Sequence, residues 1–180
     1  MLPTMKSRRG NSVLEFSMVG IPLIFVLISI FEISRGMWVY HTLAYAIKQG
    51  TRYAAVHGQN CSAAPNSCSA TIGNIAGVIQ NAGVGLLPDQ LTLNFCAPPG
   101  GSPPSCTSGN AQASCSLTNC LTNTTVWPPN GANRPGFDDI VITGTYPFAS
   151  AIALVWPGAH STNVFPTFNF PASARERVEF

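Results

Sequence analysis

Charged residues are scarce in this sequence. Asp, Glu, Lys and Arg make up 9% of its 180 residues, whereas an average soluble domain contains about 25%. The formal net charge is only +2, and no stripe of Lys and Arg alternates with aromatic residues. These features argue against a nucleic-acid partner. They are typical of a chain that lies partly in lipid and consists otherwise of small polar residues.

The motifs of common enzyme and metal sites are also missing. The sequence has no glycine-rich phosphate loop, H-E-x-x-H, G-x-S-x-G or C-x-x-C, which serve phosphate binding, zinc hydrolysis, acyl transfer and zinc binding. The one adjacent carboxylate pair, Asp138 and Asp139, fits a solvated turn or a cap beside a strand, and it offers too few oxygens for Ca²⁺. We therefore expect no catalysis, metal, cofactor or small-molecule substrate.

Cysteine is absent from the first 60 residues, and all six cysteines follow in polar sequence rich in Gly, Pro and Ser. An even number in such a setting predicts disulfides in an oxidising compartment. Six cysteines allow 15 pairings, of which the short-range pairs 61–68 and 115–120 are the simplest. The six are Cys61, Cys68, Cys96, Cys106, Cys115 and Cys120.

An apolar run without charge extends over residues 16–31, FSMVGIPLIFVLISIF. As a helix it would be about 24 Å long, shorter than a hydrocarbon core of about 30 Å. A span over residues 11–31 would measure about 31 Å, but it includes Glu15. A carboxylate at that depth is costly unless it is protonated, paired or drawn to the interface. Pro22 predicts a kink in the span, because it removes a backbone donor.

A cleaved secretory signal is the main alternative for this segment. It would combine basic residues, the apolar run and a small-x-small cleavage site. The nearest such site, AYA at residues 44–46, lies well downstream, beyond Glu32 and Arg35. Signal peptidase needs its site close to the apolar run, so the sequence favours a retained membrane span.

Basic residues and cysteines together orient the span. Lys6, Arg8 and Arg9 precede it without an acid among the first ten residues, while Arg35 and Lys48 follow it, so the positive-inside bias is modest. The predicted disulfides require the non-cytoplasmic side. We therefore expect a single-pass membrane protein with a cytoplasmic amino end and an exported carboxy-terminal domain.

Beyond the span, the helix is expected to continue over residues 32–57. Mostly apolar residues recur there every three or four positions, which predicts a buried stripe. The stripe fits packing against the protein's own domain, and it also fits packing against partner helices. Its residues are Ile33, Met37, Tyr40, Ala44, Ile47, Thr51 and Ala54.

A second helix is predicted over residues 69–83. Ser69 is placed to cap it, and Gly73 and Gly77 are spaced to allow close approach to the first helix. Its apolar face comprises Ile72, Ile75, Ile79 and Ala82.

Alternating apolar and polar residues predict strands at 91–95 and 140–148, and residues 165–180 offer a third. Pro147 suggests that its strand lies at an edge. Between the first two strands, residues 96–133 are expected to form a disulfide-braced loop. A long helix across a small antiparallel sheet gives an α+β class. The phenylalanines expected in its core are Phe165, Phe168 and Phe170.

A G-x-x-x-x-E-F signal opens the apolar run at Gly10, Glu15 and Phe16. Pro22 follows, then FEISRG at 31–36 and AYAIKQGTRYAA at 44–55. This pattern resembles the TadE-like family, small pilin-related membrane proteins of the tight-adherence (Flp-type) pilus. The likeness is specific over about the first 58 residues. It is weaker at DIVITGTYPF and ASARER, residues 139–148 and 172–177.

The resemblance implies cleavage by a prepilin peptidase between Gly10 and Asn11. Glu15 would then be the fifth residue of the mature chain, where pilins pair a carboxylate with the free amino terminus of a neighbouring subunit. An unpaired charge in lipid is unfavourable, so Glu15 would act as a register residue, one that fixes the alignment of neighbouring helices. Without cleavage, Glu15 would be an interfacial residue near Arg8 and Arg9. Asn11 departs from the aromatic first residue of many type IV pilins, which argues against a major pilin.

The sequence thus predicts a leader at 1–10, a span at 11–31, an amphipathic continuation at 32–57 and an exported domain at 58–180. We expect a minor pilin or pseudopilin that acts by membrane insertion and helix packing. Its partners would be the lipid bilayer, other pilus subunits and the prepilin peptidase. The alternative is a membrane-anchored binding domain whose span is only a tether.

Overall fold

A computed structural model describes residues 9–58, 62–63, 66–97, 106, 111–128, 139–150 and 167–178. The chain divides into two compact units. The first comprises Met1–Gly36 and Ser150–Pro166, and the second comprises Met37–Ala149 and Thr167–Phe180. The fold is α+β, as the sequence predicts, with a long apolar helix and a four-stranded antiparallel sheet.

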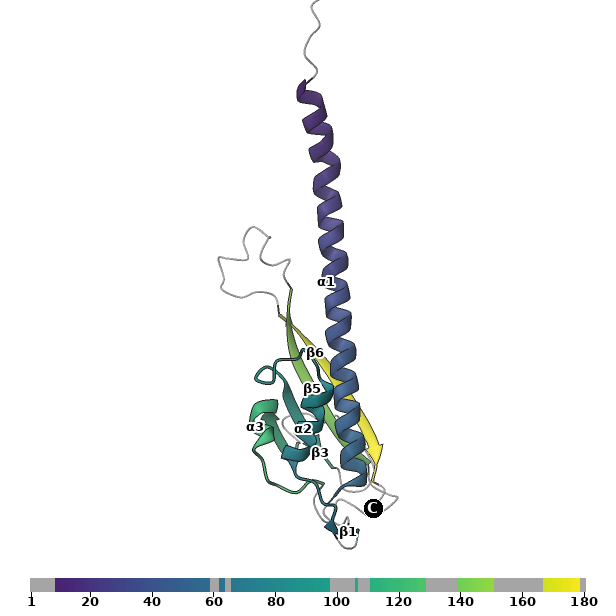
Figure 1. Cartoon of the computed structure of the whole chain (residues 1–180), viewed down its shortest axis with the longest axis vertical. Helices are drawn as coiled ribbons and strands as arrows, with labels where there is room; N and C mark the ends of the chain where they lie inside the picture. Colours follow the sequence, from purple (N-terminus) through teal and green to yellow (C-terminus); the bar gives the residue numbers. More distant parts are fainter. Residues whose placement is uncertain are drawn as a thin grey trace, which may run out of the picture. The chain divides into compact units, whose positions relative to one another are not determined.

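The long helix α1 extends from Arg9 to Val56 without interruption (Figure 1). Pro22 lies inside it with helical residues on both sides, and the kink expected there stays a prediction. Within the first unit, the large apolar side chains of α1 from Val13 onward are exposed, except Ile28, which is half-buried. Among the described residues, α1 is the one helix long and apolar enough to cross a membrane.

The second unit is built on a sheet with the strand order β4-β3-β5-β6. All three pairings are antiparallel. The strands are β3 (Thr92–Cys96), β4 (Ala113–Ser116), β5 (Asp139–Ala149) and β6 (Thr167–Arg177). A separate pair of short strands, β1 (Ser62–Ala63) and β2 (Asn66–Ser67), follows α1.

The core of the second unit lies between one face of the sheet and the helices. Leu43 and Ile47 of α1 are fully buried, and a Cβ atom at Gly144 of β5 would lie 2.6 Å from Cδ1 of Ile47. The absence of a side chain at Gly144 therefore lets α1 approach the sheet closely. Trp127 is also buried in this core. Its ring lies edge-on to the ring of Phe95, with 5.3 Å between the ring centroids.

The buried stripe of α1 differs from the predicted one. Ala44, Ile47, Thr51 and Ala54 are buried or half-buried as expected, whereas Ile33, Met37 and Tyr40 are exposed. The buried side of α1 is therefore centred on other positions than the predicted stripe. It includes the small residue Gly50, which lets α1 pack closely against α2. The buried positions from the start of the second unit onward are Val39, Leu43, Ala46, Ile47, Gly50, Thr51, Ala54 and Ala55.

The second helix, α2, runs from Ile72 to Ala82 with its apolar face in the core. Its N-cap is Thr71, whose Oγ1 accepts a hydrogen bond from the Asn74 backbone N–H at 3.2 Å, so the prediction of Ser69 was wrong. Gly50 of α1 is the glycine that lets α1 and α2 approach closely, because a Cβ at Gly50 would lie 2.4 Å from Cγ1 of Ile79 in α2.

The two glycines of α2 do not serve the predicted purpose. A Cβ at Gly73 would meet the carbonyl oxygen of Leu121 at 2.7 Å, and one at Gly77 would meet nothing within 4 Å. Gly73 thus accommodates the end of α3 (Leu117–Leu121), a short helix in the region predicted to be a loop. The strand β4 was missed in the same region.

Two details of the sheet also differ from the predictions. β5 lies between β3 and β6 and is not an edge strand, but its pairing with β3 ends at Thr145. Pro147 lies beyond that point, so its missing donor breaks no bond to β3. Phe170 packs against the core, while Phe168 is 58% exposed. Phe165 is outside the described residues.

Candidate functional site

The first unit exposes an apolar surface along α1 from Val13 to Phe31. Exposed fractions range from 48% at Phe25 to 79% at Phe16. A monomeric soluble protein rarely leaves so much contiguous apolar area in water. Lipid tails are the environment in which this surface is favourable, since its transfer from water to hydrocarbon lowers the free energy.

The hydroxyl groups of this part of α1 are satisfied within the helix. Ser17 donates to the carbonyl of Leu14 at 3.0 Å, and Ser29 donates to that of Phe25 at 2.8 Å. A polar group in hydrocarbon costs several kcal/mol if it lacks a partner, and back-bonding to the preceding turn removes that cost. These serines are therefore compatible with a membrane span.

Glu15 is the one ionisable side chain of α1 between residues 13 and 31, and it is exposed. The backbone of Gly10 and Asn11 forms the first turn of the same helix. Phe16 follows Glu15 and is the most exposed of the large apolar residues in this segment. The predicted cleavage site and the predicted register residue thus lie one to two helical turns apart.

Charged residues return where the apolar segment ends. Arg35 Nη2 lies 3.3 Å from Oε2 of Glu32, one helical turn away. The hydroxyl of Ser150, which follows β5, donates to the same Glu32 oxygen at 3.0 Å. The Glu32 side chain is only 13% exposed. No local pattern predicts this contact, because Ser150 lies 118 residues further along the chain.

Residues 10–52 match the family model of the TadE-like protein. No curated protein and no solved structure matches the chain. The match confirms the resemblance carried by the amino-terminal motifs and indicates a protein associated with the tight-adherence pilus. It includes Gly10, Asn11, Glu15, Phe16 and Pro22. The weaker likeness at residues 139–148 and 172–177 lies outside the match and stays a prediction.

The TadE-like segment, residues 10–52, carries a second exposed surface in the second unit. Met37, Trp38 and Tyr45 are each more than half exposed. Lys48 and Arg52 lie among them on the side of α1 away from the core. This mixed surface is a candidate for contact with other helices, but of its residues only Met37 belongs to the predicted stripe.

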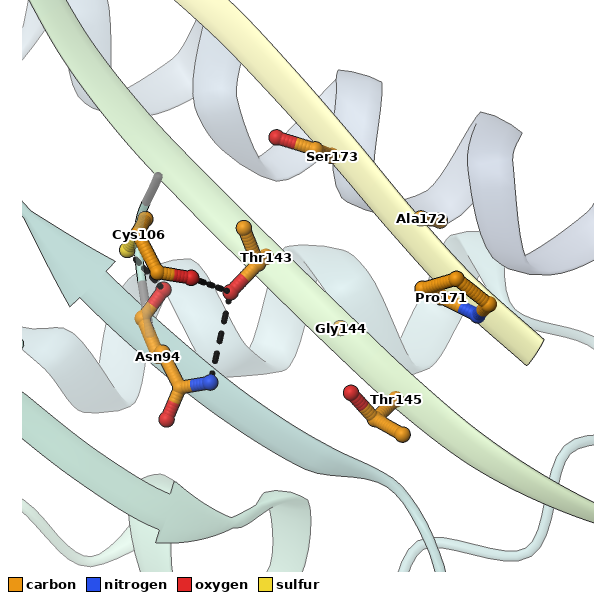
Figure 2. A pocket seen from close by; sticks show the side chains of 8 residues that line it. All are labelled: Asn94, Cys106, Thr143, Gly144, Thr145, Pro171, Ala172 and Ser173. Atoms are coloured by element: carbon orange, nitrogen blue, oxygen red, sulfur yellow. Dashed lines mark hydrogen bonds between the residues drawn. The ribbon is translucent and has the colours of Figure 1, made fainter. Parts of the chain in front are cut away.

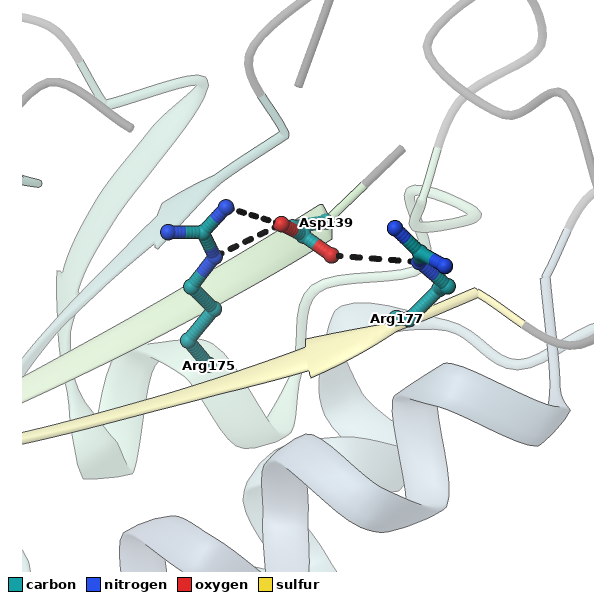
Figure 3. A network of polar contacts seen from close by, with 3 residues as sticks. All are labelled: Asp139, Arg175 and Arg177. Carbon is teal, nitrogen blue, oxygen red and sulfur yellow. Dashed lines mark hydrogen bonds and ion pairs between the residues drawn. The ribbon is translucent and has the colours of Figure 1, made fainter. Parts of the chain in front are cut away.

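Beyond the TadE-like segment, ion pairs join the ends of β5 and β6. Figure 3 shows Asp139 between two arginines: Arg175 binds it through two nitrogens, one of them Nε at 2.7 Å, and Arg177 Nε lies 3.8 Å away. Arg52 of α1 lies 3.6 Å from Glu176. Asp139 therefore forms ion pairs with two arginines of β6. Asp138 is outside the described residues.

Disulfides brace the second unit. Cys115–Cys120 is present, as predicted, and Cys96–Cys106 is a second bond. Cys68 is disulfide-bonded as well, whereas its predicted partner Cys61 is outside the described residues. Within the described ranges, no group of three or more His, Cys, Asp and Glu side chains could hold a metal ion.

Proposed function

We propose that this protein is a minor pilin or pseudopilin, a structural subunit that helps to assemble a tight-adherence pilus or a related secretion system. The observation that carries the proposal is the exposed apolar surface of α1 from Val13 to Phe31, interrupted by one acid, Glu15. The TadE-like match covers this surface. The protein would act by membrane insertion and helix packing, without catalysis.

The proposed topology follows from charge and disulfides. Lys6, Arg8 and Arg9 precede the span and favour a cytoplasmic amino end. The bonds Cys96–Cys106 and Cys115–Cys120 favour an extracytoplasmic position for the second unit. The protein would therefore be anchored once in the inner membrane, with its sheet on the outer side.

Glu15 is the proposed register residue. Cleavage by a prepilin peptidase after Gly10 would create a free amino group at Asn11, a cation close to the level of Glu15 in a neighbouring subunit. A buried ion pair gains little net stability, but either charge alone in lipid is strongly unfavourable. This difference would favour one alignment of neighbouring helices over the others.

Replacing Glu15 by Gln tests this role. The amide keeps the shape of the side chain but removes its charge, so we expect pilus assembly to fall at least tenfold while the exported, disulfide-bonded domain remains at wild-type level. Ser17→Ala is the matched control, because the Ser17 hydroxyl donates to the carbonyl of Leu14 in its own helix. Assembly can be measured as sheared surface pili by immunoblotting.

An unchanged yield of pili in the Glu15→Gln strain would contradict the register role. The result would instead support the second candidate function, a tethered extracytoplasmic binding domain. The disulfide-braced sheet of the second unit is the observation that favours that candidate.

A further inference from the structure

The second unit exposes large apolar side chains around the end at which α1 enters it, named the entry end. α1 enters this unit at Met37, and the loop after α2 and the start of β6 lie at the same end. The exposed fractions range from 45% at Tyr40 to 68% at Val84. A soluble monomer rarely leaves such residues together in water. They are named the apolar rim: Met37, Trp38, Tyr40, Val84, Leu87 and Phe168.

The loop after α2 reaches the entry end because α2 runs antiparallel to α1. α2 packs against Gly50 of α1, whereas a Cβ at Gly85, beyond α2, would lie 2.4 Å from Cη2 of Trp38. The chain therefore moves toward the amino end of α1 as it passes through α2 and into the loop. Val84 and Leu87, on the two sides of Gly85, are 68% and 56% exposed. Both side chains thus belong to the entry end.

The start of β6 lies at the entry end because β6 runs in the same direction as α1. The ring centroids of Tyr40 and Phe170 are 6.2 Å apart. Further along both elements, Nε of Arg52 lies 3.6 Å from Oε1 of Glu176. Phe168 precedes Phe170 by two residues, about 7 Å along a strand, and it is 58% exposed. Phe168 is therefore nearer to the entry end than Phe170 is.

Charge is scarce at the entry end. The segments that carry the rim, residues 37–47, 83–88 and 167–174, contain no Asp, Glu, Lys or Arg. Asp89 follows the loop, and its carboxylate accepts a hydrogen bond from Thr118 Oγ1 at 2.6 Å. The ion pairs that Asp139 forms with its two arginines lie at the opposite end of β5. The second unit is thus apolar at the entry end and charged at the other end.

Linked hydrogen bonds occupy polar side chains in the pocket on the sheet face turned away from α1 (Figure 2). Asn94 Nδ2 donates to Thr143 Oγ1 at 3.3 Å, and Thr143 donates to the carbonyl of Cys106 at 3.1 Å. Ser114 donates to Asn94 Oδ1 at 2.7 Å. The rim differs from this pocket because its exposed groups are apolar, and their contact with water is unfavourable. The rim is therefore the surface that a partner would cover.

The arrangement of the rim around α1 indicates what covers it. Trp38 and Tyr40 are two residues apart, about 200° around the helix, so the rim lies on both sides of α1. A partner helix packed along α1 would contact one side of it. α1 also continues past Met37 toward its amino end. An occupant that contacts the whole rim must therefore surround the helix, as lipids surround a membrane span.

The distance along α1 agrees with a lipid surface. Met37 follows Phe31, the last residue of the uncharged apolar run, by six residues, or about 9 Å of helix. Headgroups add about 5–8 Å on each side of the hydrocarbon core. Trp and Tyr are enriched at this level of membrane proteins, because their rings combine apolar area with a polar group. Trp38 and Tyr40 thus stand where such residues are favoured.

We propose that the apolar rim docks on the lipid surface from which α1 emerges, at the boundary between headgroups and acyl chains. Val84 and Leu87 enter this boundary beside Trp38. Residues further along α1, such as Tyr45 and Arg52, lie beyond the rim and stay available to other helices. The inference rests on the proposed membrane anchor, but it requires neither the charge at position 15 nor cleavage of the leader.

The test uses the full chain in vesicles of dioleoylphosphatidylcholine and the photoreactive residue p-benzoylphenylalanine, introduced at one position at a time. Irradiation joins the probe to its neighbour, and intact mass spectrometry identifies a lipid adduct. The probe in place of Leu87 or Phe168 should give about fivefold more lipid adduct than in place of Val56, because interfacial residues reach the acyl boundary. Val56 is the matched control, since it is also exposed but lies about 28 Å beyond Met37 along α1. Phe25, in the span, reports on the anchor itself.

A pair of charged variants tests the rim without the probe on the loop. Val84→Asp combined with Leu87→Asp should lower the lipid adduct at Phe168 about threefold, because carboxylates are unfavourable at the acyl boundary. Val56→Asp should leave that adduct unchanged. All three substituted residues are exposed, so circular dichroism spectra should match the wild type.

The possible results separate this inference from the anchor. Lipid adducts at Phe25 without adducts at Leu87 and Phe168 would overturn the inference and leave the anchor intact. No adduct at Phe25 would overturn both. A cross-linked dimer of the chain, formed from Leu87 or Phe168, would also overturn the inference, because a second copy would then cover the rim. An unchanged adduct at Phe168 in the doubly charged variant would have the same consequence.

Discussion

At the scale of single residues, glycines decide how closely the helices and the sheet approach. Gly50 faces Ile79 of α2, and Gly144 faces Ile47 of α1. A residue without a side chain carries no apolar signal, so a search for apolar periodicity assigns it to no face. This is why the predicted stripe included the exposed Met37 and missed Gly50.

Substituting alanine at Gly50 and at Gly77 should have opposite effects on stability. At Gly50 the new methyl group would overlap Ile79, an overpacking cost of about 1–3 kcal/mol that exceeds the gain in helix propensity of about 1 kcal/mol. Gly77→Ala meets nothing within 4 Å and should stabilise the fold by about 0.5–1 kcal/mol. Urea unfolding in detergent micelles, followed by the fluorescence of the buried Trp127, measures both free energies. Equal or reversed effects would contradict this packing.

At the scale of elements, the strands and helices whose apolar residues recur at a regular spacing could be predicted from the sequence. The strand at β5 and its buried face of Ile140, Ile142 and Gly144 follow from simple alternation. β4 was missed because ASCS contains only small residues, and its pairing with β3 is a tertiary contact. The hydrogen bond from Ser150 to Glu32 has no local signature either.

The start of α2 gives a test at this scale. Thr71→Ala removes the side chain that caps the helix and should lower the free energy of unfolding by about 1 kcal/mol. Ser69→Ala, at the position that the sequence favoured, should change it by less than about 0.5 kcal/mol. Thermal or urea unfolding of both variants beside the wild type distinguishes the two caps. A larger loss for Ser69→Ala would show that the observed cap is wrong.

At the scale of the whole molecule, the sequence predicted a long apolar helix followed by a small α+β domain, and both are present. The family match supports the assignment of the helix. The four-stranded sheet could not be predicted as a whole, because its rows combine residues from β3, β4, β5 and β6. Its pairing registers exist only in the folded sheet. The division into leader, span, continuation and exported domain stays a prediction.

The central claim is that a processed, pilin-like helix anchors this protein in the inner membrane. Intact mass spectrometry with amino-terminal sequencing, applied to the protein from its native membrane, tests it most directly. We expect a chain that begins at Asn11, with Glu15 as its fifth residue. A chain that still carries residues 1–10, or one that begins near Tyr45 or Ile47 after removal of the apolar segment, would contradict it.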